Sequence, residues 1–279
     1  MNKHILAPTL AAALLAITSQ AQAGAILLTE FDYGPAVYID MKNNLEADGH
    51  TVTIVNARTG GNVAAALASG SFDQVFLWDL TATAYLNGND YNALSSFFGA
   101  HQNIVLDSRS YGYNFQGNNA SEVQLLQNIA NAFDSRGGGL WVGTDHNPAW
   151  TRNANPLLNQ LGFQTITGMY GQSVNDFDPD SILLDGVIAT DLWAAGQTVG
   201  AVPLGVQPNG LDMRFHFGHS SSTYGAIPYI SASFGNYVAP DEDPDDHLPP
   251  DVSVPAPAAW VLGALSLFGL SASRRRRNS

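Results

Sequence analysis

Acidic, basic and imidazole side chains follow four of the apolar runs in the first half of this chain. They are Glu30 and Asp32 after 25–29, Asp79 after 74–78, Asp107 and Arg109 after 103–106, and Asp145 and His146 after 140–143. If these runs are parallel strands, their carboxyl ends meet at one edge of a sheet, where open α/β sheets bind ligands. Such side chains can bind a polar ligand, and two carboxyls could hydrolyse a glycosidic bond. Ordinary polar loops would give the same pattern, so both interpretations stay open.

Three of the polar residues are candidates for catalysis. An aspartate can attack a carbon or phosphorus centre with an imidazole as its base, which suggests Asp145 as nucleophile and His146 or His219 as base. Adjacent side chains in a turn point in different directions, however, and neither Gly-x-Ser-x-Gly nor His-Glu-x-x-His occurs in the chain. Binding in a ligand pocket that includes His219 and a purely structural turn are the alternatives. We therefore assign no catalytic residue and favour a protein that is not an enzyme.

A second acidic group lies in the second half of the chain and consists of Asp176, Asp178, Asp180 and Asp185. Ca²⁺ takes about 6–8 oxygen ligands and suits alternating carboxylates, so calcium is the candidate cofactor. The segment lacks the glycine and the terminal glutamate of an EF-hand loop. A solvated acidic loop is the alternative.

The segment 214–222 alternates polar and aromatic residues. On a strand, Phe215 and Phe217 would face the core, while Arg214 and His216 would share the opposite face. His219 would then lie at the end of the strand, where it could join the acids described above.

Strand-like and helix-like segments alternate through the first 162 residues. The predicted strands are 25–29, 52–55, 74–78, 103–106 and 140–143, and the predicted helices are 36–48, 62–69, 90–101, 121–135 and 155–161. Asn89 or Asp90 would cap the third helix and Ser121 the fourth. This alternation predicts an α/β fold, an open and mostly parallel sheet with helices on both faces. Further strands at 181–184, 213–217 and 227–230 predict a loop-rich C-terminal extension of that sheet.

The fifth predicted strand and its turn, 137–146, run Gly-Gly-Gly-Leu-Trp-Val-Gly-Thr-Asp-His. This resembles the Gly-rich strand and turn of class I glutamine amidotransferase-like proteins, including ThuA-like proteins tied to sugar metabolism. In that family the turn is Gly-x-Cys-x-Gly, and Gly143, Asp145 and Asn147 match its first glycine, its nucleophile and its last glycine. The resemblance covers 25–162 and implies a flavodoxin-like, amidotransferase-like fold. Since the chain has no cysteine, amidotransferase chemistry is excluded.

The N-terminus has the features of an export signal. A short positive region, 1–4, precedes the apolar run 5–17, and Ala21-Gln22-Ala23 is a small-x-small cleavage site. We therefore predict a signal peptide over 1–23, an α/β domain over 24–237, an acidic Pro-rich linker over 238–253, and a tail over 254–279. The linker's like charges and prolines favour an extended spacer.

The tail has three parts: the run Val254-Pro255-Ala256-Pro257, an uncharged segment over 256–273, and the cluster Arg274, Arg275, Arg276 and Arg277. As a helix the segment would span roughly 27 Å, close to the bilayer core, with the arginines on the cytoplasmic side. The tail resembles the PEP-CTERM sorting signal, with alanine where that family usually has Val-Pro-Glu-Pro. The resemblance implies recognition through Pro255 and Pro257 by a membrane processing enzyme and association with extracellular polysaccharide. A plain membrane anchor is the alternative.

The chain carries a net charge of −13, and five of its eleven basic residues are Lys3 and the tail arginines. The exported domain is therefore strongly acidic, which disfavours nucleic acid as a partner. We expect an exported cell-surface or extracellular-matrix protein whose domain binds a glycan or a partner. An exported hydrolase acting on polysaccharide is the alternative. Aromatic residues expected near the pocket would suit sugar stacking under both hypotheses: Trp78, Tyr111, Tyr113, Trp150 and Tyr170.

Overall fold

The structure, a computed structural model, describes residues 24–31, 35–80, 85–100, 102–107, 119–134, 139–143, 147–192 and 198–235. These residues belong to the first of two units of the chain, Met1–Tyr237, and the second unit is Val238–Ser279. The predicted signal peptide, linker and sorting tail lie outside the described residues. Among the helices that are described, none is long and apolar enough to cross a membrane.

Five neighbouring strands, which begin at one edge of the sheet, pair in parallel. They are β1 (Ala25–Glu30), β2 (Thr51–Asn56), β3 (Gln74–Leu77), β4 (Asn103–Asp107) and β5 (Gly139–Gly143). Their order across the sheet is β2-β1-β3-β4-β5, which is the flavodoxin-like order. Every residue of β3, β4 and β5 is buried, as expected for parallel strands that helices cover on both faces.

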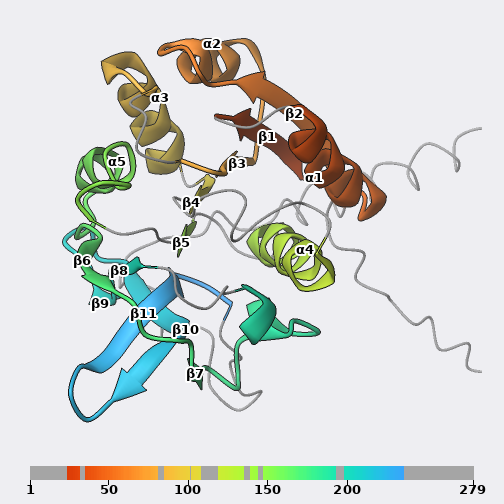
Figure 1. Cartoon of the computed structure of the whole chain (residues 1–279). Helices are drawn as coiled ribbons and strands as arrows, with labels where there is room; N and C mark the ends of the chain where they lie inside the picture. The colour runs from red at the N-terminus through yellow and green to blue at the C-terminus, as the bar shows by residue number, and fades with distance from the viewer. Residues whose placement is uncertain are drawn as a thin grey trace, which may run out of the picture. The chain divides into compact units, whose positions relative to one another are not determined.

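Five helices cover the two faces: α1 (Pro35–Ala47), α2 (Asn62–Ser69), α3 (Gly88–Gly99), α4 (Ala120–Asp134) and α5 (Ala154–Gln160). Alternate residues of β1 separate the core into two clusters, since Leu28 packs with α1 and α4 while Leu27 packs with α2, α3 and α5. Figure 1 shows the two groups of helices on opposite sides of the strands. The predicted open, mostly parallel α/β sheet with helices on both faces is confirmed.

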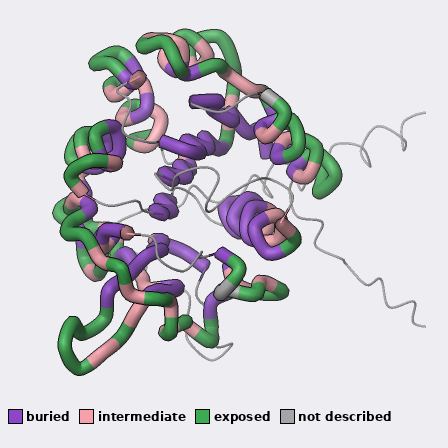
Figure 2. Tube along the Cα trace, in the orientation of Figure 1, coloured by how far each residue is buried: buried purple, intermediate pink, exposed green. Residues whose placement is uncertain are grey.

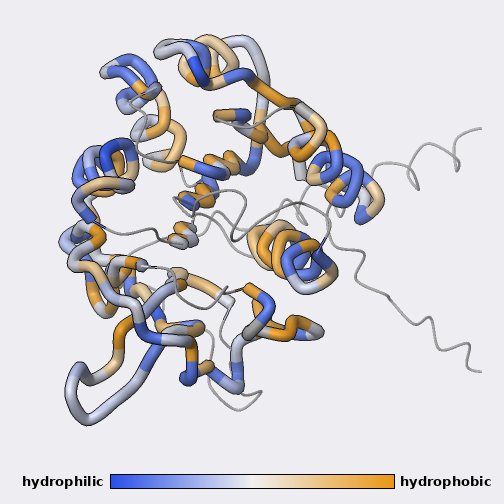
Figure 3. The backbone as a smooth tube through the Cα atoms, in the orientation of Figure 1, coloured by the Kyte–Doolittle hydropathy of each residue, from blue (hydrophilic) through white to orange (hydrophobic). Residues whose placement is uncertain are grey.

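Burial and hydropathy follow this layering. The central strands are buried, whereas the turn between β10 (Asp212–Ser221) and β11 (Gly225–Ala232) is exposed (Figure 2). Helix α4 has an apolar side and a hydrophilic side (Figure 3), and its apolar residues Leu126, Ile129 and Phe133 belong to one of the two core clusters. The 3.6-residue apolar spacing of this helix therefore predicts its packing face correctly.

The C-terminal part adds antiparallel strands beyond β5. Strand β11 pairs with β5, β10 pairs with β11, and β7 (Asp176–Phe177) and β9 (Gly205–Val206) pair with β10. Strands β6 (Thr167–Tyr170) and β8 (Val199–Ala201) form a separate two-stranded sheet. Two 3₁₀ helices, η1 (Ile182–Leu184) and η2 (Ala189–Leu192), lie in the connection between β7 and β8. The predicted extension of the sheet is thus present.

The strand predicted at 181–184 is wrong. The backbone N–H of Leu184 donates to the carbonyl of Ser181 over 3.1 Å, which is the three-residue bond of a 3₁₀ turn. A short apolar run does not separate a strand from a helical turn by its pattern alone.

Both predicted helix caps lie too late in the sequence. Asn87 caps α3, because its side chain accepts from Asn89 and Asp90 while the Asp90 carboxylate accepts from the N–H of Asn87. At α4 the side chain of Asn119 accepts from the N–H of Ser121 over 2.9 Å. In each case an asparagine slightly earlier in the chain has the right spacing for the first turn.

The predicted face of His216 is also wrong. Register shifts interrupt the pairing of β10 with β11 on both sides of Phe217, and such irregularities break the alternation of a strand. His216 is therefore fully buried and Phe215 only partly buried, whereas Phe217 lies in the core as predicted.

Candidate functional site

The carboxyl ends of neighbouring strands meet in one row. Leu28 pairs with Phe76, and Leu77 pairs with Leu106. Glu30 at the end of β1, Trp78 just after β3 and Asp107 at the end of β4 therefore lie at the same level of the sheet. Residues that alternate with Glu30 and Asp107 along their strands belong to the cluster under α1 and α4. Because side chains in register share a face, Glu30 and Asp107 point to the same side of the sheet.

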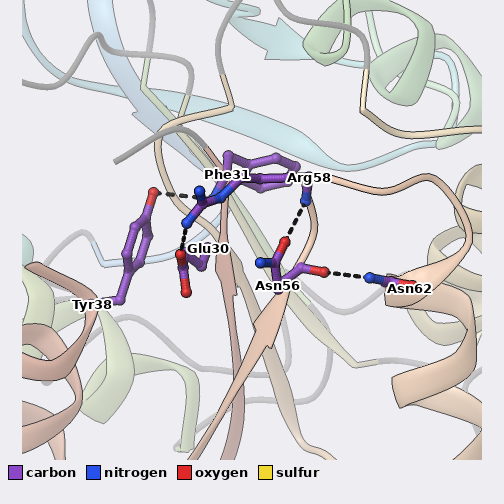
Figure 4. Close-up of polar contacts among 6 residues, drawn as sticks. All are labelled: Glu30, Phe31, Tyr38, Asn56, Arg58 and Asn62. Carbon is purple, nitrogen blue, oxygen red and sulfur yellow. Dashed lines mark hydrogen bonds and ion pairs between the residues drawn. The ribbon is translucent and has the colours of Figure 1, made fainter. Parts of the chain in front are cut away.

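Glu30 is largely buried and forms an ion pair with Arg58, which lies just after β2. The backbone around Arg58 is fixed by Asn56: its side chain accepts from the N–H of Arg58 over 3.0 Å, and its carbonyl accepts from Asn62 over 2.7 Å (Figure 4). Arg58 is a residue that sequence reasoning missed. The sequence contained the signal, because Arg58 follows the second predicted strand just as the other candidates follow theirs.

A tyrosine holds the chain where it leaves β1. The N–H of Phe31 donates to the hydroxyl of Tyr38 over 3.2 Å (Figure 4), and both residues are buried. This contact joins the end of β1 to helix α1. It fixes the entry to residues 32–34, which lie outside the described part and include the candidate Asp32.

The turn after β3 has unusual backbone geometry. Asp79 has a φ of 59°, a left-handed conformation that aspartate adopts more readily than most residues. The next N–H, that of Leu80, donates to the carbonyl of Asp107 over 2.7 Å. The turn is thereby tied to the end of β4, and both Asp79 and Asp107 are buried.

Gly143 ends β5 and pairs with Asp107. A Cβ atom at Gly143 would lie 2.7 Å from the Trp141 ring and 3.0 Å from a carboxyl oxygen of Asp107. Glycine is therefore required for this close approach of ring, strand and carboxylate. This position is the one that the amidotransferase-like resemblance aligned with the first glycine of the turn.

Trp78 does not present its ring to a ligand, contrary to the expectation of sugar stacking. It is 2 % exposed and stacks on Trp141 with ring centroids 5.8 Å apart. Trp78 is therefore part of the hydrophobic core beneath the acidic residues. Trp150 and Tyr170 are partly exposed, and Tyr111 and Tyr113 lie outside the described residues.

A further buried acid belongs to the same side of the sheet. Glu122 is 1 % exposed and lies in the first turn of α4. Because α4 follows β4, its first turn lies at the carboxyl ends of the strands. Sequence reasoning missed Glu122, although an acid in the first turn of a predicted helix is a recognisable signal.

His219 is not brought beside these acids. It lies on β10 and its ring Nδ1 donates to the carbonyl of Ser173 over 2.9 Å, since a carbonyl only accepts. Strands β5 and β11 separate β10 from β4, so three strand spacings, roughly 14 Å, separate His219 from the row of Asp107. The other candidates Arg109, Asp145 and His146 lie outside the described residues.

The predicted calcium ligands lie elsewhere, beside β7 and η1. Asp178, Asp180 and Asp185 line an open cavity of about 660 Å³, whereas Asp176 lies on β7 and pairs with Gly218. One carboxyl oxygen of Asp178 accepts from the N–H of Asp180 over 2.9 Å. Within the described ranges, no three acidic or histidine side chains are gathered closely enough to hold a metal ion.

The described site can therefore bind polar groups through carboxylates that a folded scaffold holds in place. Glu30, Asp79 and Asp107 lie at the carboxyl ends of the neighbouring strands β1, β3 and β4, and Arg58 forms an ion pair with Glu30. Comparison of the chain with protein-family models, with curated proteins and with solved structures gave no match.

Proposed function

We propose that this chain is an exported, C-terminally sorted protein of the cell surface or extracellular matrix, whose α/β domain binds a glycan. The observation that carries the binding proposal is the Arg58–Glu30 ion pair at the carboxyl ends of the parallel strands, where Asp79 and Asp107 also lie. The two terminal signals carry the proposed location. Export would proceed through the secretion machinery, and a processing enzyme in the membrane would act on the tail.

A glycan fits this edge chemically. Sugar hydroxyls donate hydrogen bonds to carboxylates and accept them from a guanidinium. An acidic domain repels anionic polymers, but a neutral polysaccharide carries no charge to be repelled. Arg58 and Glu30 keep 38 % and 10 % of their side chains exposed, so a sugar would contact this ion pair, and the buried Asp79 and Asp107 would lie beneath it.

Co-sedimentation of the full-length protein with the polysaccharide of the producing cells tests the proposal. Arg58→Gln removes the guanidinium donors and keeps a polar side chain, and we expect binding to weaken about tenfold, the effect of losing one charged hydrogen bond. Arg152→Gln is the matched control, because Arg152 is exposed. Equal binding by the wild type and Arg58→Gln would refute the proposed site.

A second candidate function is hydrolysis of a polysaccharide. Glu30 and Asp107 share a face and are separated by one strand, so their backbones lie roughly 9–10 Å apart. Inverting glycosidases place their two carboxyls about 6.5–9.5 Å apart, which this arrangement approaches. Release of reducing ends by the wild type, and its loss in Glu30→Gln with folding intact, would favour the hydrolase; wild-type protein that binds but releases none would exclude it.

Two further expectations remain proposals. Helix-covered strands in the flavodoxin-like order and the required glycine at 143 support a domain related to the class I glutamine amidotransferase-like proteins.

Calcium at Asp178, Asp180 and Asp185 would require their segment to close around the ion. A rise in melting temperature with calcium, absent in Asp180→Asn, would support that site.

A further inference from the structure

The backbone of Gly24 has a partner at each polar atom. Its N–H donates to ring Nδ1 of His50 over 3.2 Å, and its carbonyl accepts from the N–H of Thr51 over 3.0 Å. The next N–H, that of Ala25, donates to a carboxyl oxygen of Asp73 over 2.8 Å. Gly24 and His50 are both buried. This residue is therefore built into the fold, although it precedes the first strand.

Hydrogen bonds from Asp48 through Asn131 select the tautomer of His50. Asn131 donates from its amide nitrogen to Asp48 over 2.6 Å, which turns its amide oxygen toward His50 Nε2 at 3.2 Å. Nε2 must carry the proton in that contact, so Nδ1 keeps a lone pair. The lone pair points at the nitrogen of Gly24. His50 is thus an acceptor that Asp48 and Asn131 hold in one tautomer.

Gly24 is also the residue that follows the predicted cleavage site at Ala23. Hydrolysis of the Ala23–Gly24 bond consumes one water and leaves a carboxylate on Ala23 and an ammonium group on Gly24. The ammonium keeps a hydrogen available for His50, and its positive charge lies one residue from the amide that Asp73 accepts. A charge-assisted hydrogen bond is stronger than the neutral bond it replaces.

We propose that the α-ammonium group created by signal-peptide removal is bound by His50, with Asp73 as its neighbouring carboxylate. This inference goes beyond glycan binding and rests on cleavage after Ala23. Gly24, His50 and Asp73 precede β1, β2 and β3, so they lie at the amino ends of the parallel strands. The amine site is therefore at the opposite edge of the sheet from Glu30 and Asp107, and either proposal can fail without the other.

Amine acylation of the processed protein tests the inference. The full-length gene is expressed with its export signals, and the product is treated with an acylating reagent in native buffer and in urea. Mass spectrometry of peptides locates the N-terminus and measures the rate at its amine. Lys42 is the internal reference, because it is the only lysine after Lys3 and is partly exposed on α1.

We expect an N-terminus at Gly24 whose amine, relative to Lys42, reacts at least about tenfold more slowly in the native protein than in urea. His50→Leu should remove this protection, whereas His219→Leu, on β10, should retain it. A different N-terminus, or equal relative rates in native buffer and urea, would overturn the inference. If His50→Leu does not fold, His50→Phe, which keeps a planar ring without the acceptor nitrogen, takes its place, and protection that persists in the variant would overturn the inference.

Discussion

His216 shows how one polar side chain is accommodated in the core. Its Nε2 donates to the carbonyl of Phe234 over 3.0 Å, so its Nδ1 is free to accept from the hydroxyl of Ser181 over 2.6 Å. Burial lowers the pKa of His216 to about 4, against the opposing effect of the nearby Asp178. The imidazole is therefore neutral in the folded protein at ordinary pH.

Stability should consequently fall as the pH is lowered from about 6.5 to about 4. In that window the unfolded chain binds a proton at His216 and the folded chain does not. Above about 6.5 the residue is neutral in both states, and below about 4 it is protonated in both. The loss attributable to His216 approaches about 3 kcal/mol. Urea unfolding of the wild type and His216→Gln at several pH values measures it.

The informative quantity is the difference in free energy of unfolding between wild type and His216→Gln, because carboxylates also titrate at low pH. As the pH falls from about 6.5 to about 4, the wild type should lose its advantage in free energy of unfolding over the variant. His219→Gln, a partly exposed histidine on the same strand, is the control. A difference that stays constant from pH 7 to pH 4 would contradict a neutral buried His216.

Gly143→Ala should destabilise the protein and disturb the candidate site. The added methyl group would lie 2.7 Å from the Trp141 ring, which must then shift, and 3.0 Å from a carboxyl oxygen of Asp107, and overpacking of this kind costs about 1–3 kcal/mol. Near-ultraviolet circular dichroism should also change, because Trp141 stacks on Trp78. Gly88→Ala is the matched control, since a Cβ there meets nothing within 4 Å. Equal effects of the two substitutions would count against the close approach at Gly143.

At this scale the sequence identified the acids but not their partners. Glu30, Asp79 and Asp107 were found because a residue after a buried strand must lie at the edge of the sheet. Arg58 and Glu122 were missed, although each stands at the end of a predicted element. Trp78 was expected to be exposed, and nothing in its local pattern shows that Trp141 covers it; that contact depends on the order of the strands.

Among the elements, α2 and α3 depend on one carboxylate. Asp90 is fully buried and accepts from the N–H groups of Gly61 over 2.7 Å, Ala64 over 3.0 Å and Asn87 over 3.0 Å. Amides at the start of a helix have no partner within it. Asp90 thus satisfies the first turns of two helices and joins them on one face of the sheet.

Asp90→Ala should therefore lower the free energy of unfolding by about 2–5 kcal/mol, because three partly buried backbone amides lose their acceptor. Asp90→Asn keeps one acceptor oxygen and should cost less. Asp40→Ala, an exposed change on α1, provides the control in the same urea titration. A cost for Asp90→Ala no larger than that for Asp40→Ala would show that the shared cap does not stabilise these helices.

Elements with strong periodicity were predicted well, and those defined by tertiary contact were not. The five parallel strands and five helices all lie within a few residues of their predicted positions, because apolar runs and 3.6-residue spacing are local signals. The irregular part of β10 near Phe217 and the 3₁₀ turn at 182–184 were not predicted. Their conformation depends on pairing with β11 and on the bond from Ile182 to Gly235, which are distant in the sequence.

For the whole molecule, the two edges of the parallel sheet have different chemistry. At the amino ends, His50 accepts from Gly24 and Asp73 accepts from Ala25, and the carboxyl ends carry acidic residues, of which Glu30 pairs with Arg58. The proposed export and sorting signals would place this acidic domain outside the cytoplasm. The proposed location and the proposed glycan site are therefore independent claims, and location comes first because it determines which ligands the domain meets.

Intact-mass measurement of the protein recovered from the cell envelope and the medium tests that location most directly. We expect a chain that begins at Gly24 and ends between Val254 and Pro257, without the uncharged segment and the arginine cluster. A mass that retains Met1 and Ser279, in protein recovered from the cytoplasm or held in the inner membrane, would contradict it.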